Sequence, residues 1–123
     1  MTKNGLGNLG EDYACDVLEA LDYEVLARNF RSRFGEVDII ARDGNTIVLV
    51  EVKTRVSHAR DEDVAPEFSV GNRKRGKYQK LALIYLAKEP RFDSVRFDVA
   101  AVKLVDKNTA RIRYMTSAYE WDY

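Results

Sequence analysis

Little in this sequence could crosslink the chain or hold it in a membrane. Its 123 residues include a single cysteine, Cys15, so no intrachain disulfide can form, and a reducing compartment suits such a chain. No apolar run approaches the ~20 residues that a membrane-spanning helix needs. Residues 1–5 also lack the apolar stretch of a signal peptide. We therefore expect a soluble, cytoplasmic protein without a membrane partner, in which Cys15 is a packed thiol rather than a nucleophile.

An excess of either charge sign is missing as well. Twenty basic and 20 acidic residues give a formal net charge of zero, which argues against a protein that coats nucleic acid through bulk positive charge. The signs are nevertheless segregated, because residues 4–27 contain only acids and residues 68–88 only bases. Such a basic cluster is either a solvated helix face or a phosphate-binding patch. Its crowded members are Arg73, Lys74, Arg75, Lys77 and Lys80.

Hydrophobic periodicity predicts a single α/β domain over residues 1–123, with no repeat and no internal linker. Residues 1–7 are expected to be flexible. The strand that follows the second helix is expected to pair in parallel with an earlier strand. The expected elements, in order, are a helix over residues 9–21, strands over 23–30 and on both sides of the turn Asp43-Gly44, a mobile loop over 55–72, a helix from about Arg73, and strands over 95–104 and 110–115.

The stretch GEVDIIARDGNTIVLVEVKTR, residues 35–55, carries charged side chains where buried strands want none. With the expected hairpin turn, Asp38 pairs with Leu49, and Glu36 pairs with Glu51. Because side chains alternate along a strand, both acids of the first strand then share a face with Glu51 and Lys53. The sequence therefore predicts that two carboxylates and an amine converge.

Crowded carboxylates such as Asp38 and Glu51 repel each other, and a hard divalent cation, Mg²⁺ or Mn²⁺, relieves that repulsion. Lys53 could then orient or polarise an attacking water and offset charge that develops on a phosphate. The alternative is that Glu51 and Lys53 form an exposed ion pair on the wet face of a sheet.

Several segments together resemble the YraN-type family of small, uncharacterised bacterial proteins. They are GEDYACDVL, NFRSRFGEVDII, VLVEVKTR, the Lys74 and Lys77 pair that opens a helix, RFDVAAV and SAYE, and they span nearly the whole chain. GEVDII and VEVKTR also resemble the PD-(D/E)-x-K core of restriction-endonuclease-like nucleases, a superfamily that includes Holliday-junction resolvases. The resemblance implies a restriction-endonuclease-like fold, an αβββαβ core with a mixed central sheet flanked by helices, and a Mg²⁺-dependent phosphodiesterase ancestry.

Carried over residue by residue, the superfamily pattern implies that Asp38 and Glu51 are the metal carboxylates and Lys53 the catalytic lysine. Glu11 would be the acid from the first helix, because it lies on the apolar stripe with Ala14. The alternative for Glu11 is an acid stabilised near a helix N-terminus. Glu36 is either a supporting acid or a residue of the turn that faces water.

Basic residues around the second helix are candidates for binding the nucleic acid. Lys74 and Lys77 resemble the helix-borne bases that such nucleases aim at the scissile phosphate, although snorkelling lysines would look the same. His58 is either a solvated loop residue or a nucleic-acid contact. Further phosphate contacts are expected from Arg55, Arg73 and Arg75.

We therefore expect a Mg²⁺- or Mn²⁺-dependent endonuclease that acts on DNA, with branched or structured DNA as one option. Two other hypotheses are a nucleic-acid-binding module without turnover and a dimeric scaffold that retained the nuclease fold. A homodimer would suit a junction with two equivalent strands. The tail with Tyr119, Trp121 and Tyr123 is expected to cover either the domain's own core or a partner.

Overall fold

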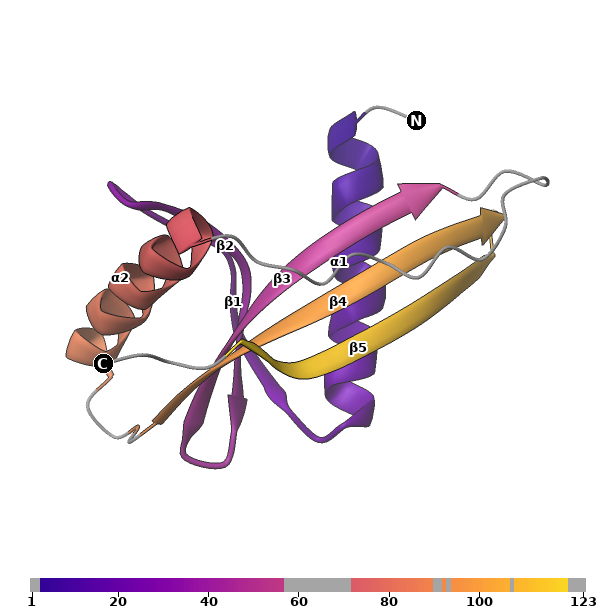
Figure 1. Ribbon diagram of the computed structural model, residues 1–123. Helices are drawn as coiled ribbons and strands as arrows, with labels where there is room; N and C mark the ends of the chain where they lie inside the picture. The colour runs from indigo at the N-terminus through magenta and orange to yellow at the C-terminus, as the bar shows by residue number, and fades with distance from the viewer. Residues whose placement is uncertain (1–2, 57–71, 90–91, 93, 107, 120–123) are drawn as a thin grey trace.

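The protein is an α/β domain built on one five-stranded sheet (Figure 1). The computed structural model describes residues 3–56, 72–89, 92, 94–106 and 108–119. The strands follow one another across the sheet in chain order, β1-β2-β3-β4-β5. The elements are α1 (Lys3–Ala20), β1 (Glu24–Ser32), β2 (Gly35–Asp43), β3 (Thr46–Val56), α2 (Asn72–Lys88), β4 (Ser94–Asp106) and β5 (Thr109–Tyr119).

The sheet is mixed, as the sequence predicts. β1, β2 and β3 are antiparallel neighbours, β3 and β4 run parallel, and β5 returns antiparallel to β4. The parallel pair follows from the chain path, because α2 forms the crossover that β4 needs to start at the same end as β3. The αβββαβ order and the helix-flanked sheet confirm the expected restriction-endonuclease-like core.

Each helix covers a different face of the sheet. Ala14 and Leu18 of α1 are fully buried in one apolar cluster, as expected from the stripe they form. The strand residues of that cluster are Ile39, Ala41, Val48, Val50 and Ala100. The second cluster lies under α2 and contains Val37, Ile40, Ile47, Leu49, Tyr78, Leu81, Ala82, Phe92 and Phe97. Neither described helix is both long and apolar enough to span a bilayer.

Some boundaries differ from the expected ones. Helix α1 begins at Lys3 rather than at residue 9, so most of the start that was expected to be flexible is helical. β3 continues to Val56 and α2 begins at Asn72, which takes both ends of the predicted 55–72 loop into regular structure. Residues 57–71, with His58, and residues 120–123, with Trp121 and Tyr123, lie outside the described residues.

The turn between β2 and β3 is Gly44-Asn45, not Asp43-Gly44. Asp43 pairs with Thr46, which leaves a two-residue loop between them. Gly44 has a φ of 60°. Among two-residue hairpin loops, the type II′ turn places glycine with positive φ at its first position, and this explains why Gly44 rather than Asp43 begins the loop.

This turn changes the expected partners across the hairpin. Leu49 pairs with Ile40, so the predicted pairs Asp38 with Leu49 and Glu36 with Glu51 are wrong. The observed register brings Asp38 level with Glu51, one step beyond the last pair of the ladder. The charge of Glu51 raises the pKa of Asp38, so the two carboxylates do converge although the predicted pairs do not form.

Candidate active site

The carboxylate of Asp38 lies where β2 and β3 stop pairing. Val37 and Ile40 both belong to the cluster under α2, whereas Ile39 packs under α1. Regular alternation would place Val37 and Ile39 on the same face, so β2 departs from the regular pattern at Asp38. Backbone pairing with β3 ends at Ile39. Beyond that point, Oδ2 of Asp38 accepts the backbone N–H of Val52 at 2.8 Å.

Three other carboxylates lie close enough to Asp38 to act on its charge. Burial raises the pKa of Asp38 from 3.8 to about 6, although the hydrogen bond from Val52 lowers it. The negative charges of Glu11, Glu51 and Glu36 each raise it further. Three of the four acids that the sequence predicts for the site therefore act on the charge of the fourth, the half-buried Asp38.

Glu11 reaches the sheet because α1 approaches β3 very closely. A Cβ atom at Gly10 would lie 1.9 Å from Oγ1 of Thr54, so a larger residue could not take this place without moving the helix. Glu11 is only 8 % exposed, and its Oε1 accepts a hydrogen bond from Arg28 of β1 at 3.3 Å. Arg28 also donates to Asp12 at 2.8 Å. One arginine of the neighbouring strand thus holds this part of α1 in place.

The alternative reading of Glu11 is wrong. Because α1 begins at Lys3, Glu11 lies about two turns inside the helix, beyond the reach of the N-terminal dipole. Its position is explained instead by the approach of α1 to the sheet and by the pair with Arg28.

Glu51 lies on the face of β3 that α2 covers. Leu49, two positions earlier, packs under α2, and alternation puts Glu51 and Lys53 on the same side. Burial raises the pKa of Tyr78 in α2, and the charges of Glu51 and Asp38 raise it further. Glu51 is 7 % exposed, so the alternative of an ion pair on a wet face is wrong for this residue. Lys53 is half-buried beside it.

Glu36 lies at the edge of the site rather than in a turn. It belongs to β2 and pairs across the sheet with Arg31 of β1, with 3.1 Å between Oε2 and Nε. Its side chain is 35 % exposed. A supporting position fits these contacts, because the carboxylate acts on Asp38 through charge while its own ion pair faces solvent.

Among the predicted basic residues, Lys77 contacts the start of β2. Its alkyl chain crosses Gly35, where a Cβ atom would lie 2.4 Å from Cε of the lysine. Gly35 has a φ of 127°, a conformation that also favours glycine. Arg55 is exposed on β3. Arg73, Lys74 and Arg75 belong to the first turns of α2, whose backbone leads into Lys77.

The carboxylate oxygens of Asp38 and Glu51 are of the chemical kind that Mg²⁺ takes in proteins. In the described part of the chain, no three side chains of His, Cys, Asp or Glu converge closely enough to hold a metal ion among them. Mg²⁺ commonly uses only one or two protein carboxylates and completes its shell with water and substrate phosphate. Asp38 and Glu51 fit that requirement as a pair.

The raised pKa of Asp38 predicts a stability effect with a definite sign. The folded protein binds the Asp38 proton more tightly than the unfolded chain, so the ionised carboxylate destabilises the fold as the pH rises from 3.8 to about 6. Asp38→Asn keeps an oxygen that can accept the Val52 hydrogen bond and removes the charge. We expect the free energy of unfolding to rise by about 1–3 kcal/mol at pH 7, with no gain below pH 4.

Urea denaturation of both proteins between pH 3.5 and 7.5, without divalent cations, measures this difference. Asp16→Asn, an exposed residue of α1, is the matched control and should change stability little at any pH. If the difference in the free energy of unfolding between wild type and Asp38→Asn does not change with pH, the raised pKa of Asp38 is contradicted.

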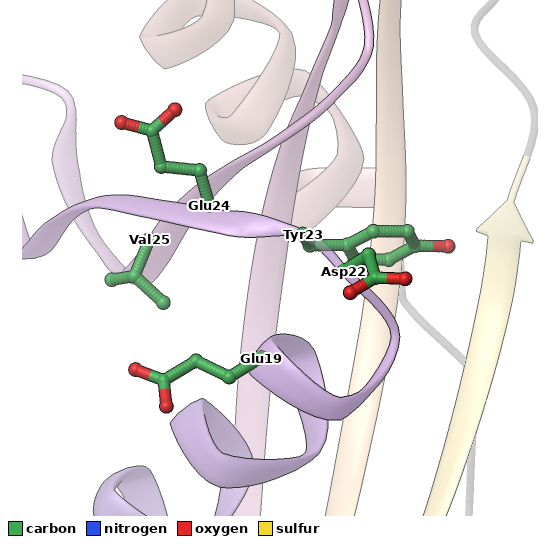
Figure 2. Close-up of a pocket in the computed structure, with 5 residues that line it drawn as sticks. All are labelled: Glu19, Asp22, Tyr23, Glu24 and Val25. Atoms are coloured by element: carbon green, nitrogen blue, oxygen red, sulfur yellow. The ribbon is translucent and has the colours of Figure 1, made fainter.

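A shallow pocket at the far end of α1 does not coincide with this site (Figure 2). It is lined by Glu19, Asp22, Tyr23, Glu24 and Val25. Glu19 lies about 12 Å along the helix axis from Glu11. The chain leaves α1 here through Asp22, whose φ is 63°. Its three acids and absence of bases make the pocket unsuited to phosphate.

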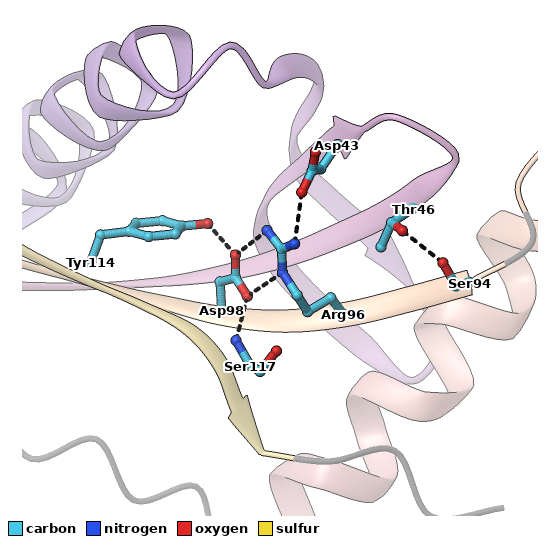
Figure 3. Close-up of polar contacts among 7 residues, drawn as sticks. All are labelled: Asp43, Thr46, Ser94, Arg96, Asp98, Tyr114 and Ser117. Carbon is cyan, nitrogen blue, oxygen red and sulfur yellow. Dashed lines mark hydrogen bonds and ion pairs between the residues drawn. The ribbon is translucent and has the colours of Figure 1, made fainter.

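A third buried acid, Asp98 of β4, was not identified from the sequence. Its side chain is fully buried and forms a bidentate pair with Arg96, with both bonds at 3.0 Å (Figure 3). Asp98 also accepts hydrogen bonds from the hydroxyl of Tyr114 and the backbone N–H of Ser117. Arg96 reaches on to Asp43 at 2.8 Å. The sequence did contain a signal for Asp98, because RFDVAAV places an acid in an apolar strand just as GEVDII does.

Comparison with known proteins gives one family. Residues 10–102 match the model of the uncharacterised protein family UPF0102. A UPF0102 protein of Syntrophus aciditrophicus is 46% identical over 126 residues, covering 100% of this chain and 95% of the relative. UPF0102 proteins of Geobacter sulfurreducens and Thermodesulfovibrio yellowstonii are each 43% identical over 119 residues. The alignments cover 96% and 97% of this chain and 91% and 99% of those relatives.

Proposed function

Since the chain belongs to the uncharacterised protein family UPF0102, the YraN-type family that its sequence resembles, we propose its activity from the site: a metal-dependent endonuclease that hydrolyses phosphodiester bonds in DNA, with branched or structured DNA as its substrate. The observation that carries this proposal is the pair of carboxylates just beyond the point where β2 and β3 stop pairing, with Glu51 buried and Asp38 half-buried. Lys53 projects from the same face of β3 as Glu51.

The carboxylates argue for an enzyme rather than for a simple binding surface. Burying acids beside one another costs stability, and phosphate binding alone gains nothing from negative charge. A divalent cation held by Asp38 and Glu51 accounts for both carboxylates, and when bound it supplies Lewis-acid polarisation of a phosphate oxygen. Glu11 and Glu36 add negative charge around Asp38, which favours a cation there.

Lys53 supplies the positive charge that the acids lack. Its ammonium group donates hydrogen bonds to the attacking water or to a phosphate oxygen and offsets negative charge as water adds to phosphorus. Glu51 and Lys53 both belong to β3 and lie two positions apart, so the strand fixes the position of Lys53 relative to Glu51. Lys77, whose alkyl chain crosses Gly35, binds a phosphate of the substrate, and Arg73, Lys74 and Arg75 are proposed as further phosphate contacts.

Cleavage of DNA measured with and without divalent cations tests the proposal. Wild-type protein should cut a four-way branched DNA in the presence of Mn²⁺ or Mg²⁺, cut linear duplex more slowly, and cut neither in EDTA. The double variant Asp38→Asn, Glu51→Gln is the matched control, since it keeps the shape of both side chains and removes both charges.

Calorimetry on the same two proteins separates the remaining functional hypotheses. Wild type should bind Mn²⁺ at millimolar concentration, and the double variant should not. DNA binding with neither cleavage nor metal binding would instead favour the non-catalytic module, and the enzymatic proposal would then be wrong.

A further inference from the structure

The tip of the β1–β2 hairpin carries an aromatic ring in a fixed position. Ser32 and Gly35 close the hairpin as a pair, and Arg33 and Phe34 form the turn between them. Oγ of Ser32 accepts the backbone N–H of Phe34 at 3.0 Å. The turn is therefore tied to its own base, and Phe34 is half-buried rather than loose in solvent.

Two cations lie over this ring. The guanidinium carbon of Arg33 is 4.8 Å from the ring centroid of Phe34, and Nζ of Lys80, from α2, is 5.2 Å from it. Both cationic side chains are exposed. A cation that rests on an aromatic face keeps its charge available and has less freedom to lose when it binds an anion.

The surroundings of the turn are basic. Residues 25–35 contain no acid, and neither does α2 from Asn72 to Lys88. The first acid along β2, Glu36, is paired with Arg31. Lys77 crosses Gly35 next to the turn and continues the positive surface toward the carboxylates. A polyanion is therefore the partner whose charge complements this surface.

We propose that Arg33, Phe34 and Lys80 form a phosphate clamp that binds the DNA strand outside the reacting bond. The four residue steps from Phe34 in the turn to Asp38 in β2 span about 13 Å. Since each strand of B-DNA carries one phosphate per ~3.4 Å of helix axis, the clamp contacts a phosphate a few nucleotides from the one at the carboxylates. Arg33 and Lys80 bind the phosphate, and Phe34 holds both cations beside its ring. The inference rests on the proposed function only in taking DNA as the polyanion.

Fluorescence anisotropy with a labelled duplex oligodeoxynucleotide, measured in EDTA across a series of salt concentrations, tests the clamp without requiring cleavage. Arg33→Gln with Lys80→Gln should weaken binding about 10-fold at low salt and make the salt dependence shallower by about two ion equivalents. Phe34→Leu keeps both charges, so it should leave the slope unchanged and weaken binding roughly 3-fold. Arg113→Gln is the control, because Arg113 is exposed on β5, the edge strand opposite to β1. It should change the affinity for DNA by less than the double variant or Phe34→Leu does.

The clamp is wrong if the double variant binds with the affinity and salt slope of wild type, or if wild type binds no DNA. Unchanged binding by Phe34→Leu would remove the ring from the clamp and overturn the arrangement proposed. Thermal denaturation of each variant shows whether its fold is retained. Wild type that binds through Arg33 and Lys80 but never cuts would refute the nuclease and support the clamp, so the two failures are distinguishable.

Discussion

Replacing Lys53 by methionine should lower the rate of DNA cleavage by about 10²- to 10³-fold, the loss typical of removing one donor that stabilises charge in a transition state. The ammonium group is needed most when negative charge develops on the phosphate, so kcat should fall while DNA binding changes little. Single-turnover cleavage of the branched substrate, together with anisotropy measurements in EDTA, separates the two effects. Methionine keeps the unbranched stem of lysine, so the packing beside Glu51 is preserved.

Lys88→Met provides the matched control for this result. The substitution is the same, but Lys88 is exposed in the last turn of α2, about 16 Å along the helix from Lys77. Its cleavage rate should equal that of wild type. If Lys53→Met cleaves DNA at the wild-type rate, this lysine has no catalytic role, whatever result the substitution of Asp38 and Glu51 gives.

Asp98→Ala should lower the free energy of unfolding by about 3–5 kcal/mol, the cost of breaking a buried charge pair by removing one partner. The substitution leaves Arg96, whose side chain is only 20 % exposed, with Asp43 as its remaining carboxylate among the contacts of this cluster. It also takes the acceptor from the hydroxyl of Tyr114 and the N–H of Ser117. A loss of this size is a large part of the stability of an ordinary domain.

Urea denaturation at pH 7 measures that loss, and Asp16→Ala on the exposed side of α1 is the comparison. The control should stay within about 0.5 kcal/mol of wild type. Alternation with Ala100 places Asp98 on the face of the sheet that α1 covers, whereas Glu51 lies on the face that α2 covers. Asp98→Ala protein that still folds should therefore still bind metal. A destabilisation below about 1 kcal/mol would mean that water replaces the lost carboxylate.

The faces of the strands could be predicted from the sequence because a strand has a period of two. The turn between β2 and β3 proved to be Gly44-Asn45, which moves each cross-strand partner by two positions. An even shift leaves every side chain on its face, so Glu51 and Lys53 remained on the side expected for them despite the wrong register. For a similar reason the helical spacing placed Glu11 correctly with Ala14 on the buried stripe of α1.

Contacts between elements far apart in the sequence were decided only by the tertiary structure. The approach of Gly10 to Thr54, the pair of Arg28 with Glu11 and the passage of Lys77 over Gly35 depend on how helices dock on the sheet. Side-chain periodicity fixes a direction and carries no information about distance to another element. A glycine in the sequence likewise does not reveal which side chain will occupy the space it leaves.

Two strand acids, Asp38 and Asp98, show the same division between what is local and what is tertiary. By itself, the sequence determined that Asp38 and Asp98 each interrupt an apolar strand, because alternation and composition are local properties of the chain. Only the tertiary structure decided their different roles. Asp98 is surrounded by Arg96, Tyr114 and Ser117, which supply donors that neutralise it. Burial raises the pKa of Asp38, and the charges of the neighbouring carboxylates raise it further. Which groups surround an acid depends on its neighbours in three dimensions, and the sequence does not show them.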